Sequence, residues 1–234
     1  MKALFPGFSQ EGIGFLRDLK KNNDRDWFTP RKQIYEEQLR LPMIELVRAI
    51  HGDMLRFAPR YVGEPAKCVF RIYRDTRFSK DKTPYKTHIA AWFRLAAAEK
   101  YNGAGYYFSV SPEEIEVAGG VYAPEPDALL AVRQHIAQDP EAFRATFAAP
   151  KVKKLLGELQ GASVTRAPKG FDPQHPAIDL IRRKQYCFFS MLDPALATTP
   201  KLAGEIVKRF EAMAPFVDYL NQPLAQRGNK PAFC

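Results

Sequence analysis

The sequence predicts an α+β fold, with a largely antiparallel sheet of about five or more strands. Helices from the N-terminal, middle and C-terminal segments are expected to pack on this sheet. Three observations predict the class: helical spacing of apolar residues over the first sixty positions, apolar-polar alternation from about 66 to 120, and a return of helical spacing afterwards. Short or moderate connections between the alternating segments are typical of antiparallel strands.

The 234 residues are expected to form a single domain, 1–234. About 1–60 is predicted to be helical and 66–120 to form the sheet core. About 126–184 is predicted to be helical with a basic loop, and 185–222 to supply a strand and the C-terminal helix. No internal repeat, low-complexity tract or flexible linker divides the chain. A chain of this length buries roughly 70% or more of its unfolded surface, so its stability requires no disulfide or metal.

Cap and proline positions predict the N-terminal helices. Ser9 is a suitable N-cap for a first helix, and Asn22-Asn23 ends it. Pro30 is suited to the first turn of the next helix, because it lacks only an N–H that would be unpaired there. Pro42 is expected to begin or kink a further helix, which Ala58-Pro59 ends.

Alternation of apolar and polar residues predicts the strands. The expected strands are 68–75, 87–95, 106–110, 114–117 and a strongly apolar one at 186–192. Gly119-Gly120 follows the fourth of these and is interpreted as a bulge or a position with positive φ, with close approach of a ligand as the alternative. Later helices are expected to open at Pro126 and Pro140, to form a turn at 177–183, and to span 201–220, with a frayed polar tail from Gln222.

Several protein classes are not indicated. No apolar run approaches the roughly 18 residues of a membrane helix. The start of the chain lacks the apolar core of a signal peptide, so a mature N-terminus and a cytoplasmic location are expected. Cys68, Cys187 and Cys234 are odd in number and widely spaced, which suggests neither a disulfide framework nor a zinc site. Cys68 and Cys187 are expected to be small buried residues of strands.

The formal net charge of +9 is unevenly distributed. Residues 66–100 contain nine Lys or Arg and three acids, and 150–184 contain eight and three, whereas 111–149 contain two and seven. Such asymmetry favours an anionic partner, because charge distribution governs association more than fold.

The connection at 76–86, between the first two expected strands, has eleven residues, whereas hairpin connections usually have about two to five. It combines four cations with two aromatic rings: Arg77, Lys80, Lys82, Lys86, Phe78 and Tyr85. Arg offers a planar fork to phosphate or carboxylate, Lys offers a point charge, and the rings offer a stacking face. Two interpretations are equally open: capture of a phosphate-bearing ligand or nucleic-acid backbone, or a solvated loop in which Arg77 pairs with Asp75.

Alternation also places polar and aromatic residues on one face of the expected sheet. They come from three strands: Arg71, Tyr73 and Asp75; His88, Trp92 and Arg94; Tyr107 and Ser109. This face is too polar for a core and too aromatic for plain solvent exposure, so it is expected to form the floor of a pocket rimmed by 76–86. The predicted ligand-binding residues are Arg71, Tyr73, Arg74, Arg77, Lys82, Tyr85, Lys86, Trp92, Arg94 and Lys169.

Whether the protein is an enzyme is left open by the sequence. His88, oriented by Asp75 or Glu116, is the weak candidate for a general base, although a lone histidine on a strand is more commonly structural. No Walker loop, nucleophile elbow or dinucleotide fingerprint occurs, so no cofactor is predicted. The four histidines are isolated and predict no metal site.

Residues 70–88, FRIYRDTRFSKDKTPYKTH, resemble the signature of family 2461 of the domains of unknown function. Further blocks agree in family order: Asn22-Asn23 through Trp27-Phe28 to Tyr35; 118–122 with Pro124; and 168–172 with His175-Pro176 and Lys184. The blocks cover nearly the whole chain. The resemblance implies no activity, cofactor or partner, because none is established for the family.

Three functional interpretations therefore remain. The leading one is a pocket for a small phosphate- or carboxylate-bearing ligand, with or without turnover. The second is nucleic-acid binding through 66–100 and 150–184, which strong salt dependence would reveal. The third is a non-catalytic interaction or scaffold protein whose charge maintains solubility.

Overall fold

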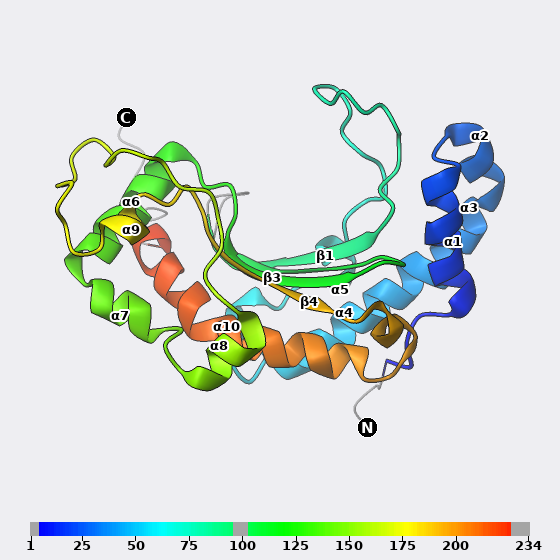
Figure 1. The fold of residues 1–234 in the computed structure, drawn as a ribbon. Coiled ribbons are helices and arrows are strands. Elements are labelled where there is room, and N and C mark those ends of the chain that lie inside the picture. Colours follow the sequence, from blue (N-terminus) through cyan, green and yellow to red (C-terminus); the bar gives the residue numbers. More distant parts are fainter. Residues whose placement is uncertain (1–4, 96–102, 226–234) are drawn as a thin grey trace, which may run out of the picture. The chain divides into compact units, whose positions relative to one another are not determined.

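The computed structural model describes residues 5–95 and 103–225 and contains one four-stranded antiparallel sheet (Figure 1). The strands are β1 (Ile89–Arg94), β2 (Gly105–Val110), β3 (Ile115–Val121) and β4 (Tyr186–Leu192), in the sheet order β1-β2-β3-β4. The α+β class and the antiparallel sheet are confirmed. A sheet of five or more strands is not confirmed, because the described residues contain these four.

Helices precede, interrupt and follow the strands along the chain. In order along the chain they are α1 (Gln10–Lys21), α2 (Arg25–Phe28), η1 (Thr29–Arg31), α3 (Lys32–Tyr35), η2 (Glu36–Arg40), α4 (Leu41–Met54), η3 (Pro59–Tyr61), α5 (Pro65–Cys68), α6 (Pro126–Gln138), α7 (Pro140–Ala145), α8 (Pro150–Leu156), α9 (Ile178–Ile181), η4 (Pro194–Thr198) and α10 (Leu202–Ala225). The helices predicted to open at Pro126 and Pro140 are confirmed, and α8 lies in the segment expected to be helical but was not predicted as a separate helix.

Contacts divide the chain into two compact units, each assembled from three segments. Unit 1 comprises Met1–Phe93, Tyr107–Val117 and Met191–Lys208. Unit 2 comprises Arg94–Tyr106, Ala118–Ser190 and Arg209–Cys234. The single domain expected for 1–234 stays a prediction.

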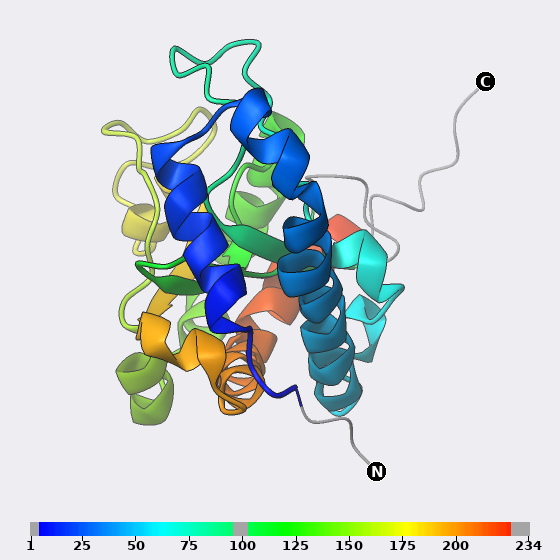
Figure 2. The same ribbon diagram turned by 90° about the vertical axis from the view of Figure 1, so that its right-hand side faces the viewer.

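Helix α1 of unit 1 begins and ends at the predicted residues. The Ser9 hydroxyl accepts a hydrogen bond from the amide of Gly12 at 3.0 Å, which satisfies one of the free amides of the first turn. At the other end, the Asn22 side chain donates to the carbonyl of Asp18 at 2.9 Å. Figure 2 shows α1 lying beside the helical run that includes α3 and η2, and these elements are in contact.

A wide turn explains how the chain accommodates Pro42. Residues Glu36–Arg40 form a π-helical turn between α3 and α4, and Pro42 lies in the first turn of α4. A proline inside a regular helix would clash with the carbonyl four residues earlier, and a π turn changes the local spacing of these groups. The helix therefore passes Pro42 without a break in the helical run from α3 to α4.

The first expected strand, 68–75, is wrong. Pro65 opens the short helix α5, and the residues that follow make two isolated antiparallel bridges, Val69 with Ala91 and Tyr73 with Tyr85. The returning segment contains Pro84, which has no N–H to donate to a ladder. The pairing around Tyr73 therefore stays limited to one bridge, flanked by a bond from the Arg74 amide to the Pro84 carbonyl at 2.8 Å.

The strands of unit 1 carry different residues on their two faces. Phe93 and Phe108 are fully buried, and the ring of His51 on α4 contacts Phe93 edge-on at 5.2 Å. Trp92 and Tyr107 point to the other face and are half-buried. The alternation predicted for these two strands is confirmed.

Unit 2 has its own aromatic core. Phe143 on α7 contacts Tyr186 at 5.9 Å and Phe216 on α10 at 5.7 Å. Gly120 lies in β3 with φ +129°, and a Cβ there would lie 2.0 Å from the carbonyl oxygen of Tyr186. The positive φ expected at Gly119-Gly120 is confirmed for Gly120, but both glycines lie inside β3 and not after the strand.

Within 5–95 and 103–225, no helix combines the length and apolarity that crossing a membrane requires. Some sequence-based expectations concern other residues. The start of the chain, Lys100 in the first basic segment, Cys234 and the end of the tail lie outside the described residues.

Candidate functional site

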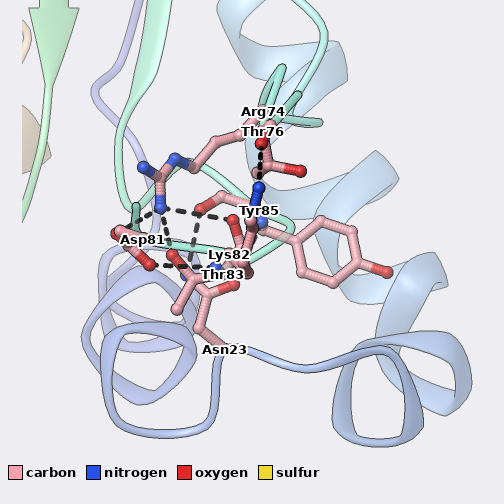
Figure 3. Close-up of polar contacts among 7 residues, drawn as sticks. All are labelled: Asn23, Arg74, Thr76, Asp81, Lys82, Thr83 and Tyr85. Carbon is pink, nitrogen blue, oxygen red and sulfur yellow. Dashed lines mark hydrogen bonds and ion pairs between the residues drawn. The ribbon is translucent and has the colours of Figure 1, made fainter. Parts of the chain in front are cut away.

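The base of the 74–84 loop is fixed to the N-terminal helices through Asn23 and Tyr85 (Figure 3). The Asn23 side chain accepts from the Tyr85 amide at 3.0 Å and donates to the Tyr85 carbonyl at 2.9 Å. The Tyr85 ring is 4% exposed and stacks on Phe28 with 4.1 Å between ring centroids. Tyr73 contacts the same ring at 5.5 Å. Both tyrosines thus belong to an aromatic cluster at the base of the loop.

Hydrogen bonds from its own charged side chains join the two sides of the 74–84 loop, as Figure 3 shows, and we call residues 74–84 the cross-linked loop. Arg74 Nη1 donates to Asp81 Oδ2 at 2.5 Å, to the Thr83 carbonyl at 3.2 Å and to the Thr83 hydroxyl. Hydrogen bonds from the Thr83 amide and from Arg74 lower the pKa of Asp81 to about 2. Lys82 Nζ donates to the Thr76 carbonyl at 2.9 Å. Arg74 and Lys82 therefore hold the loop in shape.

Arg77 and Asp75 form an ion pair with two parallel hydrogen bonds. Arg77 Nε and Nη2 donate to the Asp75 carboxylate at 2.9 and 2.7 Å. These bonds lower the pKa of Asp75 to about 2. Of the two interpretations of the loop, the one in which Arg77 pairs with Asp75 therefore describes this pair of residues. The neighbouring ring of Phe78 is 96% exposed, as expected for a solvated loop.

Lys86 differs from the loop cations. Its side chain is half-buried, and its ammonium donates to the Arg71 carbonyl at 3.0 Å and lies 4.9 Å from the centroid of the Phe70 ring. Burial lowers the pKa of Lys86, and the neighbouring Arg71 guanidinium lowers it further. Among the residues that the structure describes, no carboxylate forms an ion pair with Lys86 or Arg71.

His88 lies close to this ammonium. It is half-buried just before β1, and its pKa is lowered first by burial and then by the charge of Lys86. In the described parts of the chain no hydrogen bond joins His88 to a carboxylate, and the carboxylate of Asp75 is bound by Arg77. The arrangement therefore gives His88 a cationic neighbour where a general base would be oriented by an anionic one.

Three aromatic rings extend from this cationic group across the half-buried face. Phe70, which is 37% exposed, lies parallel to Trp92 with 6.5 Å between ring centroids and contacts Tyr107 at 6.2 Å. Burial raises the pKa of Tyr107, against the effect of its hydrogen bond with Ser109. Glu116 adds a carboxylate near Tyr107, and burial, followed by the charge of Glu114, raises the pKa of Glu116.

Phe70 is the member of this face that alternation misplaced. Alternation along the expected strand 68–75 would place Phe70 opposite Arg71 and Tyr73, on the core side, but no regular strand forms there, so the pattern does not determine its direction. Its position between two cationic residues in sequence, Lys67 and Arg71, is the one signal of exposure. We call Phe70, Arg71, Lys86, His88, Trp92 and Tyr107 the basic aromatic face.

Two predicted binding residues lie in the other unit. Arg94, at the end of β1, and Lys169, in a turn, are both exposed members of unit 2. Arg71, Lys86, Trp92 and the loop residues belong to unit 1. The structure thus brings the unit 1 residues together as two groups: the cross-linked loop and the basic aromatic face.

Cys68 is not a buried strand residue. It ends α5, is half-buried, and its Sγ lies 3.8 Å from Nε2 of His51. Burial lowers the pKa of His51, so this imidazole is held in its neutral form, which can accept a proton. No group of three or more His, Cys, Asp or Glu that would suit a metal ion occurs in the described residues.

Comparison with known proteins gives one match. No curated protein matches the chain, and no solved structure does. A family model described as "Conserved hypothetical protein (DUF2461)" matches residues 11–219, which include all of the basic aromatic face and the cross-linked loop. This match confirms the resemblance carried by residues 70–88, and the chain belongs to the DUF2461 family.

Proposed function

We propose that the protein binds a small anionic ligand, bearing a phosphate or carboxylate, on the basic aromatic face. The ammonium of Lys86 carries the proposal. The Lys86 side chain is half-buried, its ammonium faces an aromatic ring and has the Arg71 guanidinium as a cationic neighbour, and it forms no ion pair within the described chain.

Electrostatics favours an anion at this place. Burial and neighbouring positive charges both disfavour the charged form of a lysine or histidine. A bound phosphate or carboxylate would offset both effects for Lys86 and His88, and Arg71 would add a planar fork that suits such oxygens. Binding is therefore expected to raise the pKa of both groups and to take up protons.

The aromatic rings indicate the rest of the ligand. Phe70, Trp92 and Tyr107 offer apolar contact beside the cations, so the anionic group is expected to be attached to a flat or apolar body. Glu116 interacts electrostatically with Tyr107, and Glu114 interacts with Glu116. Their charges disfavour a long polyanion across this face, which favours a small ligand over a nucleic-acid backbone. The loop residues, Arg94 and Lys169 stay predictions.

The test compares phenyl phosphate and benzoate with inorganic phosphate, using thermal shift and calorimetry at constant ionic strength. Phenyl phosphate is expected to bind most tightly, and a ligand at ~100 times its Kd stabilises the protein by about 2.7 kcal/mol. Lys86→Met should abolish this stabilisation while preserving the apolar stem of the side chain. Lys80→Met, which removes an exposed cation of the loop, is the matched control and should bind normally.

Two further results separate the proposal from its alternatives. Affinity should rise as the pH falls from 8 to 6, and the binding enthalpy should depend on the buffer in the direction of proton uptake. Equal stabilisation of the wild type and Lys86→Met would contradict the proposal. Tight binding of oligonucleotides with a steep salt dependence, and none of phenyl phosphate, would favour the nucleic-acid interpretation instead.

A further inference from the structure

A carboxylate lies on the same side of the sheet as the basic aromatic face. Glu116 belongs to β3, which forms a hairpin with β2 that is closed by a bond from the Ser111 amide to the Glu114 carbonyl at 3.0 Å. Counting back from this bond along the two antiparallel strands places Glu116 opposite Ser109. Tyr107, Ser109 and Glu116 are each half-buried between fully buried neighbours, so all three share one face of the sheet.

No described cation neutralises the Glu116 carboxylate. Within 5–95 and 103–225 this side chain forms neither an ion pair nor a hydrogen bond, whereas Glu113 of the same hairpin is bound by Lys20 of α1 at 3.0 Å. Burial, followed by the charge of the exposed Glu114, raises the pKa of Glu116. A half-buried carboxylate in this position is unfavourable, because it loses contact with water and gains no compensating bond.

Aromatic rings connect this carboxylate to the cations of the basic aromatic face. The Lys86 ammonium lies 4.9 Å from the centroid of the Phe70 ring, and that centroid lies 6.2 Å from the centroid of Tyr107. Glu116 interacts electrostatically with Tyr107. Because it is opposite Ser109, Glu116 is also a diagonal neighbour of Tyr107, and such residues are about 7–8 Å apart. The face is therefore cationic at Lys86 and anionic at Glu116, with two rings between the charges.

Opposite charges on one aromatic surface suit a ligand with the reverse arrangement of charge. An anionic group would be attracted to Lys86 and the neighbouring Arg71, and an ammonium group would be attracted to Glu116. An ammonium that donates to a carboxylate makes a charge-assisted hydrogen bond, which is stronger than one between neutral groups. This bond would compensate the half-buried carboxylate and offset the repulsion from Glu114. A second anionic group at the same place would instead be repelled by both carboxylates.

We propose that the protein recognises an amphoteric aromatic compound, whose phosphate or carboxylate binds at Lys86 and whose ammonium group binds the Glu116 carboxylate. This inference rests on the function proposed above, because it assumes that the anionic group is held at Lys86. All the residues that it uses belong to unit 1. Glu116 then determines specificity: it selects ligands that end in an ammonium group over aromatic anions of the same size that end in an apolar or anionic group.

The test compares pairs of ligands that have the same shape and differ in one ammonium group. Aminoethylphenyl phosphate is paired with propylphenyl phosphate, and aminobutylphenyl phosphate with pentylphenyl phosphate, all substituted at the para position. Each compound is titrated into the full-length protein by calorimetry at constant ionic strength, and the two tether lengths allow for the span between Lys86 and Glu116. In at least one pair we expect the ammonium compound to bind about tenfold more tightly than its alkyl counterpart, as for a charge-assisted hydrogen bond.

Two variants assign this preference to one carboxylate. Glu116→Gln keeps the shape of the side chain and removes its charge, so it should lose most of the preference for the ammonium compound. Glu113→Gln is the matched control, because the carboxylate that it removes is already bound by Lys20 in the same hairpin, and it should keep the preference. The comparison of ligands in the wild type requires no variant to fold.

The outcomes separate this inference from the function on which it rests. If the alkyl compounds bind the wild type but not Lys86→Met, and the ammonium compounds bind no more tightly, the proposed function stands and the role of Glu116 is overturned. A preference that persists in Glu116→Gln also overturns it. If none of the four compounds binds, the function proposed for the basic aromatic face fails, and this inference fails with it.

Discussion

Replacement of Asn23 tests how the loop is attached to the helices. Asn23→Ala removes the hydrogen bond that the side chain accepts from the Tyr85 amide and the one that it donates to the Tyr85 carbonyl. A buried backbone group that loses its partner costs about 1–3 kcal/mol. Both bonds are part-buried, so water compensates each loss partly, and we expect the free energy of unfolding to fall by about 2–3 kcal/mol in total.

The assay is urea-induced unfolding followed by circular dichroism and by tryptophan fluorescence, which Trp27 and Trp92 supply from unit 1. Asn22→Ala is the matched control, because its exposed side chain bonds only the carbonyl of Asp18 in its own helix. We expect that control to lose only about 0.5–1 kcal/mol, because it removes a single exposed hydrogen bond at the end of α1.

A graded variant sharpens the result. Asn23→Asp keeps an acceptor for the Tyr85 amide but loses the donor to its carbonyl, so about half of the destabilisation is expected. If Asn23→Ala and Asn22→Ala reduced the free energy of unfolding equally, the two cross-chain bonds would not be what fixes the loop, and the reasoning would be refuted.

Three other predictions follow from positions described above. Gly120→Ala should destabilise the protein by about 3 kcal/mol or more, because φ is positive and the new Cβ would overlap a carbonyl oxygen. Gly14→Ala in α1 has open space around the new Cβ and should stabilise the protein by up to about 1 kcal/mol, and urea unfolding measures both changes. His51 and His88 have lowered pKa values in the folded protein, so the unfolded chain binds more protons than the folded one. The free energy of unfolding should therefore fall as the pH drops from 8 through the ordinary histidine pKa of about 6.5. Midpoints of urea unfolding measure this, and midpoints that do not change with pH would contradict it. Cys68 is half-buried and contacts the neutral His51 imidazole, so it should react with iodoacetamide faster than Cys187, which is 3% exposed. Peptide mass spectrometry measures the labelling of both cysteines, and equal labelling would contradict the prediction.

Local chemistry in the sequence predicted most of the longer helices and four of the strands. Ser9 and Asn22 predicted the ends of α1 because capping involves only neighbouring residues. Pro42 did not predict the π turn that precedes it, since that solution depends on the packing of the whole helical run. The strand expected at 68–75 failed because a ladder needs donors on both sides, and Pro84 of the partner segment supplies none.

The candidate site was predicted less completely. Sequence alternation placed Trp92 and Tyr107 on one half-buried face, because their strands are regular. It assigned Arg74, Lys82 and Tyr85 to ligand binding on charge and aromaticity alone, but these residues make internal contacts that depend on how the loop closes. The lack of an ion-pair partner for Glu116 among the described residues has no signature in sequence, since burial and pairing are properties of the folded chain.

The interleaved composition of the two units has a consequence for synthesis on the ribosome. Unit 1 includes Met191–Lys208, so it lacks one of its three segments until most of the polypeptide has been translated. Unit 2 begins at Arg94 and ends after Arg209, so it too waits for the last part of the nascent chain. Neither can form completely while the other is still untranslated, and many of their contacts join distant parts of the sequence. We therefore expect the nascent chain to stay incompletely folded until late in translation, and pulse proteolysis of stalled ribosome complexes to find little protected product before residue 208 has left the exit tunnel.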